Sequence, residues 1–223
     1  MSPSASYDAI ADWYEREFMA RTRGLREHPL GIDSALRALL DHGSDACLEI
    51  GCGTGEWAAL IRSLGRAPFG VDLSAGMLRY AKHRLPVVRA DAEHLPFASL
   101  MVPAVITIMA HTDMPRYPDV LREVSRVLRP GGVFVHVGVH PCFCGGFADR
   151  SDPTAIVIRP GYLDSYWTTD SWTSQGVRAK VGASHWPLPA LIHAFLDAGL
   201  APEHLLESGE PLPTVLAIRA RKN

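Results

Sequence analysis

The chain has 223 residues, of which 47% are hydrophobic and 21% are charged, and its formal net charge is −2. This length fits one domain, expected over residues 1–223, and the apolar content is ample for a sizeable core. Lysine and arginine are scattered, so nucleic acid is not expected as the main partner. No apolar run approaches membrane-spanning length and no secretory signal is visible, so the expected location is the cytoplasm.

Residues 1–43 predict a helical cap that precedes the first strand. Apolar and aromatic side chains recur there at helical spacing, namely at Tyr7, Ile10, Tyr14 and Phe18. A second helix is expected near residues 30–42, with three leucines turned inward: Leu36, Leu39 and Leu40.

Residues 48–55 read Leu-Glu-Ile-Gly-Cys-Gly-Thr-Gly and predict a strand, a tight turn and the start of a helix. Glycines in such a turn let the backbone come close to a bound ligand. Glu56 stands where a dinucleotide site needs its third glycine, and no lysine follows as in a phosphate loop. Glu49 precedes the first glycine, where a carboxylate repels phosphate and attracts a cation or an ammonium group.

Two aspartates each follow a further strand-like run. Asp72 ends the run at 69–72, and a carboxylate there can accept two hydrogen bonds from a ribose diol. Asp91 follows the run at 87–90 and can accept a hydrogen bond from an adenine amino group. Either aspartate alone is more readily a helix cap or a turn residue. Together with the glycine turn, in order at successive strand ends, they favour a nucleoside site.

Strand-like and helix-like runs alternate from Ala46 onward, which predicts a parallel sheet covered on both faces. Strands are expected near 46–50, 67–72, 86–90, 102–109 and 132–139, and helices near 55–65, 74–84 and 118–129. Because Pro103 cannot donate to a sheet ladder, the fourth strand is expected to begin after it.

Residues 140–186 break this alternation and are predicted to be an inserted segment on the acceptor side of a site. A helix that Gly199 ends and a strand within 213–219 are expected to close the chain. Cys47 and Cys52 are read as small buried hydrophobes. Cys142 and Cys144 form a C-x-C without the second pair that a zinc site needs, so no metal is expected.

Four segments, in this order, resemble the class I S-adenosylmethionine-dependent methyltransferases, in the group of small, mostly small-molecule enzymes. They are LEIGCGTG, VDLSAGML, ADAEHLPF and LREVSRVLRPGGVFVHVG. The resemblance covers about residues 5–140. It implies an α/β fold with a doubly wound, mostly parallel, Rossmann-like sheet of seven strands, the last of them antiparallel. It also implies an N-terminal helical lid and an irregular insertion after the fifth strand.

The resemblance further implies S-adenosylmethionine as cofactor, S-adenosylhomocysteine as product, and a small-molecule acceptor with an oxygen, nitrogen or carbon nucleophile. Gly51, Gly53 and Gly55 would approach the methionine part, and Asp72 would hold the ribose. Tyr7 and Tyr14 match aromatics of the lid helix, although ordinary helix packing explains them equally well. The implied cofactor-binding residues are Tyr7, Tyr14, Glu49, Gly51, Cys52, Gly53, Thr54, Gly55, Asp72, Leu73, Met77, Asp91, Ala92, Met109 and Ala110.

A general base is harder to assign. His111 directly follows the fourth strand and is the best candidate, although a residue that only shapes the pocket wall fits as well. Asp113 could orient His111 or serve instead. His140 follows the fifth strand, where it could face an acceptor, and His185 is a weaker candidate. Three tryptophans could wall an acceptor pocket, cover a cation or form the core of the inserted segment: Trp167, Trp172 and Trp186.

Several alternatives stay open at this point. An RNA or protein methyltransferase could share the fold, but residues 109–112 lack the motif that enzymes methylating the exocyclic amines of bases often carry, and no basic appendage follows. A protein that binds the cofactor without transferring methyl is a second alternative, because fold does not determine function. The glycine spacing disfavours an NAD enzyme. A homodimer also stays open.

Overall fold

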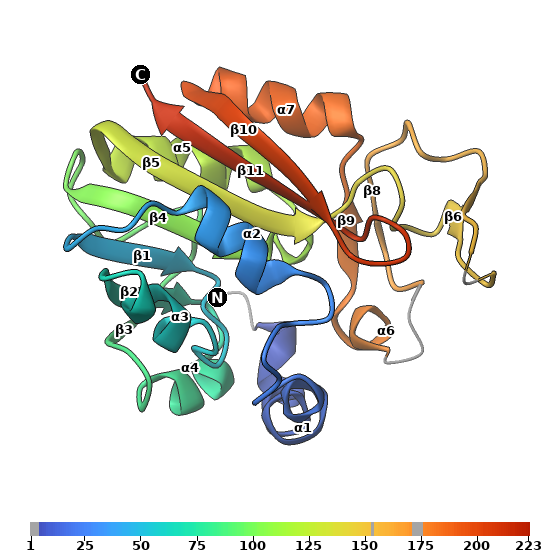
Figure 1. The fold of residues 1–223 in the computed structure, drawn as a ribbon, viewed down its shortest axis with the longest axis horizontal. Helices are drawn as coiled ribbons and strands as arrows, with labels where there is room; N and C mark the ends of the chain where they lie inside the picture. The colour runs from blue at the N-terminus through green and yellow to red at the C-terminus, as the bar shows by residue number, and fades with distance from the viewer. Residues whose placement is uncertain (1–4, 153, 171–175) are drawn as a thin grey trace.

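The structure, a computed structural model, describes residues 5–152, 154–170 and 176–223 and is built on a seven-stranded sheet (Figure 1). The strand order is β10-β11-β5-β4-β1-β2-β3. All neighbours pair in parallel except β11, which is antiparallel to both β5 and β10. The strands are β1 (Ala46–Ile50), β2 (Ala67–Asp72), β3 (Val87–Arg89), β4 (Val102–Ile108), β5 (Leu128–Val139), β10 (Leu200–Ser208) and β11 (Val215–Lys222). The predicted fold class is confirmed.

Helices cover both faces of this sheet, because the central strands bury apolar side chains on each side. Along β1, Leu48 and Ile50 belong to a cluster shared with α5 (Tyr117–Val127) and α7 (Leu188–Asp197). Cys47 points the other way, into a cluster shared with α2 (Ile32–Leu39) and α3 (Ala58–Ser63). Cys47 and Cys52 are 0% and 4% exposed, which confirms their reading as small buried hydrophobes. A third cluster joins Cys52 to α4 (Ala75–Ala81).

The start of the fourth strand differs from the sequence prediction. β4 begins at Val102 rather than after Pro103, and the pairing with β5 skips the proline, from Val102↔Leu128 to Ala104↔Val133. The missing N–H of Pro103 is therefore accommodated by an irregularity inside the strand and not by a later start. β5 in turn begins at Leu128, earlier than expected, directly after α5.

The N-terminal segment, residues 6–21, is a chain of short helical pieces rather than one helix. These are η1 (Ser6–Ala9), α1 (Ala11–Trp13), η2 (Tyr14–Phe18) and η3 (Met19–Arg21). They lie beyond the strand ends, close to α6 (Val177–Val181) (Figure 1). None of the helices in the described ranges has the length and apolarity that a membrane crossing requires.

The inserted segment, residues 140–186, has more order than its sequence suggested. Its short strands form two small two-stranded sheets beside the main one (Figure 1). They are β6 (Ala148–Asp149) with β7 (Val157–Ile158), and β8 (Tyr166–Thr168) with β9 (Ala183–His185). β9 packs against η4 (His111–Asp113), the turn that follows β4. The segment therefore reaches the carboxyl ends of the parallel strands.

Candidate active site

A cavity of about 340 Å³ lies at the carboxyl ends of β1, β2, β3 and β4, beneath the N-terminal segment. This is the edge of an open α/β sheet at which ligands generally bind. Trp167 and Val181 of the inserted segment complete its wall. Most of the predicted cofactor residues line it, from five separate stretches of the chain: Tyr7, Tyr14, Gly51, Gly53, Asp72, Leu73, Met77, Asp91, Ala92, Met109 and Ala110.

The three glycines of the turn serve different purposes. At Gly53, which lines the cavity, an added Cβ would meet nothing within 4 Å. At Gly51 it would lie 2.7 Å from the Cβ of Ala110, so the missing side chain lets the loop after β4 approach. Gly55 lies outside the lining, and its Cβ would lie 2.6 Å from Leu85 Cδ2. The structure thus brings Gly51 and Gly53 to the cavity and uses Gly55 for packing.

Three other predicted cofactor residues also lie outside the cavity lining: Glu49, Cys52 and Thr54. Their exposed fractions are 1%, 4% and 2%. Glu49 lies buried, and its Oε2 has no hydrogen-bond partner among the described residues. Burial and the nearby Asp72 raise the pKa of Glu49 to about 8. A charge on Glu49 therefore requires a cation nearby or a higher pH.

Asp72 connects the glycine turn to the start of α4. Its Oδ2 accepts a hydrogen bond from the Gly53 N–H at 2.8 Å, and its Oδ1 accepts one from the Ser74 N–H at 2.8 Å. Burial raises the pKa of Asp72, although these backbone donors act in the opposite direction. Each oxygen keeps a lone pair for a ligand. The carboxylate is thus oriented before any ligand binds.

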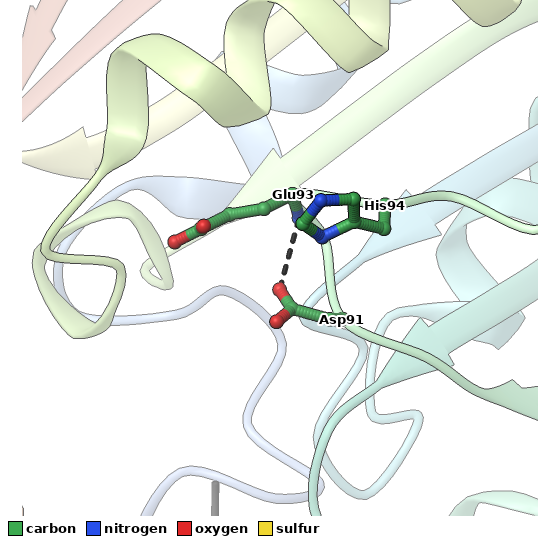
Figure 2. A group of neighbouring side chains, drawn as sticks. All are labelled: Asp91, Glu93 and His94. Atoms are coloured by element: carbon green, nitrogen blue, oxygen red, sulfur yellow. Dashed lines mark hydrogen bonds between the residues drawn. The ribbon is translucent and has the colours of Figure 1, made fainter. Parts of the chain in front are cut away.

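Asp91 also lines the cavity and lies in a tight turn (Figure 2). Its Oδ1 accepts a hydrogen bond from the Glu93 N–H at 3.0 Å, and its carbonyl oxygen accepts one from the His94 N–H at 3.0 Å. The atoms of Asp91, Glu93 and His94 that could coordinate a metal ion lie within 4.8 Å of one another. The turn accounts for that proximity, because aspartate side chains often bond the backbone two residues on.

The N-terminal segment is attached over the cavity by acidic side chains. Asp8 Oδ1 accepts hydrogen bonds from Ser74 Oγ at 2.6 Å and from the Gly76 N–H at 2.8 Å. Glu15, only 6% exposed, forms ion pairs with Arg84 and with Arg23. Arg84 also donates to the Thr54 carbonyl oxygen at 2.7 Å, which joins the segment to the glycine turn.

Asp113 is the one predicted catalytic residue that lines the cavity within the described chain. Its Oδ2 accepts a hydrogen bond from the Tyr7 hydroxyl at 3.0 Å. Burial raises the pKa of Asp113 to about 7, and the Tyr7 hydrogen bond keeps it from rising further. A carboxylate with such a pKa can exchange protons at neutral pH.

The structure places the two predicted catalytic histidines away from the cavity. His111 is 3% exposed and packs against Tyr117 and His136, and burial lowers its pKa well below the usual value. His140 is 2% exposed, and its Nε2 is bonded to Glu207 Oε1 at 2.7 Å. Adjacency to a strand end, the sequence signal for both, does not distinguish a side chain directed into the cavity from one directed into the core.

Some site residues escaped the sequence analysis. Ser74 lines the cavity and caps α4, and its position before a helical run was an available N-cap signal. Glu93 and Val181 carried no such signal. Of the three tryptophans, Trp167 lines the cavity and Trp186 packs on the core, while Trp172 lies outside the described residues. His185 Nε2 donates a hydrogen bond to the Tyr162 carbonyl oxygen at 2.7 Å inside the insertion, and His185 does not line the cavity.

The sheet order, with one antiparallel strand between β5 and β10, and the cavity beside the glycine turn define the class I methyltransferase fold. Residues 48–136 match a family model described as a methyltransferase domain. A crystal structure of an S-adenosylmethionine-dependent methyltransferase from Mesorhizobium loti superposes with a TM-score of 0.71 at 23% identity, covering 85% of this chain and 96% of that one. The chain therefore has the fold of these methyltransferases, and its residues 48–136 are similar to a methyltransferase domain, in keeping with the resemblance of its sequence.

Two curated relatives are similar over part of their length. A probable phthiotriol/phenolphthiotriol dimycocerosates methyltransferase 2 from Mycobacterium ulcerans is 40% identical over 102 residues, which cover 43% of this chain and 40% of the relative. A fatty-acid O-methyltransferase from Mycolicibacterium smegmatis is 32% identical over 124 residues, covering 52% and 45%. The chain spans less than half the length of these relatives.

Proposed function

We propose that this protein transfers a methyl group from S-adenosylmethionine to a small, lipid-like acceptor. The observation that carries the proposal is the convergence of the glycine turn, Asp72 and Asp91 on one cavity at the carboxyl ends of the strands. We infer that Asp72 holds the ribose, that Leu73 packs on the adenine, and that Asp91 and Ala92 bind its edge.

Free space beside the glycine turn and the charge of the lining support this cofactor assignment. The free space at Gly53 leaves room for a ligand against the backbone. The lining contains four acidic residues, Asp72, Asp91, Glu93 and Asp113, and its described part contains no lysine, arginine or histidine. A cationic sulfonium and an ammonium group are attracted to such a wall, and an anionic phosphate is repelled.

We infer that the acceptor binds beside Asp113, which lines the same cavity. When bound, S-adenosylmethionine supplies an electrophilic methyl group, whose carbon–sulfur bond breaks as the acceptor attacks. Asp113 is placed to take the acceptor's proton, and the surrounding residues hold the acceptor in line and exclude water. Met114, Trp167 and Val181 add apolar surface to the cavity lining. That wall suits an aliphatic acceptor, in keeping with the fatty acids and dimycocerosates in the relatives' names.

The assignment of Asp72 is tested by calorimetry with S-adenosylhomocysteine. Asp72→Asn keeps the volume of the side chain but removes its charge and one acceptor oxygen, so we expect the affinity to fall about 10- to 100-fold. The matched control is Asp45→Asn, because Asp45 is a half-exposed aspartate paired with Arg129 away from the cavity. Equal affinities in wild type and Asp72→Asn would remove the carboxylate from the site.

Methyl transfer itself is tested with a panel of fatty acids and hydroxylated lipids, by measuring release of S-adenosylhomocysteine. We expect release with at least one lipid and none with RNA. A protein that binds the cofactor but releases no product with any acceptor would be a binding protein, not an enzyme. The homodimer and the cytoplasmic location expected from the sequence stay predictions; sedimentation of the full chain measures the first.

A further inference from the structure

We propose that the N-terminal segment couples the nucleoside end of the cavity to the proton acceptor Asp113, with Asp8 and Tyr7 as positioning residues. The inference rests on the proposed function, since it assigns roles to the two ends of the same site. It concerns residues 6–21, of which Ser6, Tyr7 and Tyr14 line the cavity and which contribute no strand to the sheet.

The first part of the connection runs from the glycine turn to Asp8. Asp72 binds the Gly53 N–H with one oxygen and the Ser74 N–H with the other, both at 2.8 Å. The Ser74 hydroxyl donates to Asp8 Oδ1 at 2.6 Å, and Ser74 is itself fully buried. A ligand that bonds Asp72 therefore acts on a residue already joined to the N-terminal segment.

The second part runs from Asp8 to Asp113. Tyr7 precedes Asp8 in the same short helix, η1, so a single turn of backbone carries both side chains. The Tyr7 hydroxyl donates to Asp113 Oδ2 at 3.0 Å, and the Tyr7 ring packs edge-on against Tyr14 at 5.7 Å between centroids. While η1 contacts α4, the Tyr7 hydroxyl donates its hydrogen bond to Asp113. If η1 moved away from α4, Asp113 would lose this hydrogen bond.

Titratable side chains from several elements surround Asp113. Tyr7 and Tyr14 face Asp113 from the N-terminal segment, Asp72 from the end of β2, and Arg178 from α6. His185 lies on β9, which packs against the turn that holds Asp113.

The Tyr7 hydrogen bond lowers the pKa of Asp113, while burial and Asp72 raise it. Without that hydroxyl, a larger share of Asp113 is protonated at neutral pH and cannot accept a proton. The contact of η1 with α4 and the ionisation of Asp113 are therefore linked.

The experiment follows the carboxyl carbon of Asp113 by 13C NMR in the full chain, with Asp113→Asn to assign its signal. In Tyr7→Phe we expect the titration midpoint to move to higher pH, so that the ionised fraction at pH 7 falls about 3- to 10-fold. The matched control is Tyr80→Phe, because the Tyr80 hydroxyl bonds Asp12 of the same segment on the exposed side of α4. An unchanged midpoint in Tyr7→Phe would overturn the proposal.

Asp8→Ala tests the coupling, because it removes the oxygen that accepts from Ser74 and Gly76, and Asp8 does not line the cavity. We expect this variant to bind S-adenosylhomocysteine several-fold more weakly and to shift the Asp113 midpoint in the same direction as Tyr7→Phe. The control for this variant is Asp12→Ala, because Asp12 of the same segment also accepts hydrogen bonds, from Arg79 and Tyr80 on the exposed side of α4. Weaker binding with an unshifted midpoint would show that the two ends are independent and would overturn the coupling. If the wild type does not bind S-adenosylhomocysteine, the proposed function fails, while the Tyr7→Phe comparison still tests the Tyr7–Asp113 pair.

Discussion

Gly53 and Gly55 allow ligand binding to be separated from stability within one turn. Both have positive φ angles, +52° and +78°, so alanine at either position incurs about 1–2 kcal/mol of backbone strain. At Gly53 no further cost in stability is expected, because the new methyl group enters free space. At Gly55 the methyl group meets Leu85 at 2.6 Å and the Ala81 backbone at 3.3 Å, which adds about 1–3 kcal/mol of overpacking. The expected losses are therefore about 1–2 and about 2–5 kcal/mol.

Urea unfolding measures these losses, and calorimetry with S-adenosylhomocysteine measures the affinity of the folded variants. Gly53→Ala should bind at least about tenfold more weakly, because its methyl group occupies the ligand's space. Gly55→Ala should retain most of its affinity while it remains folded. If the two variants lost the same stability, or if Gly53→Ala bound as tightly as wild type, the division of roles between these glycines would be wrong.

Two further predictions concern parts of the fold that support the site. Burial alone would raise the pKa of Glu15, but hydrogen bonds from Arg84 and Arg23 together outweigh it and lower this pKa to about 2. The ionised Glu15 therefore adds about 3 kcal/mol to the free energy of unfolding above pH 4.5, and this contribution is lost as the pH falls toward 2. Urea unfolding at several pH values should show this loss in wild type but not in Glu15→Gln; identical pH profiles would contradict it. An added Cβ at Gly138 would lie 2.5 Å from His111 Nδ1 and His136 Nε2, so Gly138→Ala should cost about 1–3 kcal/mol of unfolding free energy. Gly146→Ala, with no atom nearer than 3.8 Å, is the control that should stay within about 0.5 kcal/mol, and equal effects would refute the packing argument.

The local sequence predicted the framework of this domain well. The alternation of apolar runs and helical stripes placed β1, β2, β4 and α5 close to their observed positions. The edge strand β10 was not located, because five consecutive residues of it, from 203 to 207, are exposed and carry no alternating pattern. The N-terminal helix was predicted as one piece, whereas its contacts with α4 and Arg84 hold it as several short turns.

The order of glycines and aspartates along the chain was enough to predict that these residues meet at one edge of the sheet, because the carboxyl ends of parallel strands lie at the same edge. What only the tertiary structure decided was the direction of each side chain at that edge. His111 and Asp113 lie two residues apart, yet one is buried beside His136 and the other lines the cavity with Tyr7. That difference depends on packing against β9 and on a tyrosine more than a hundred residues earlier in the chain, and such contacts have no local sequence signal.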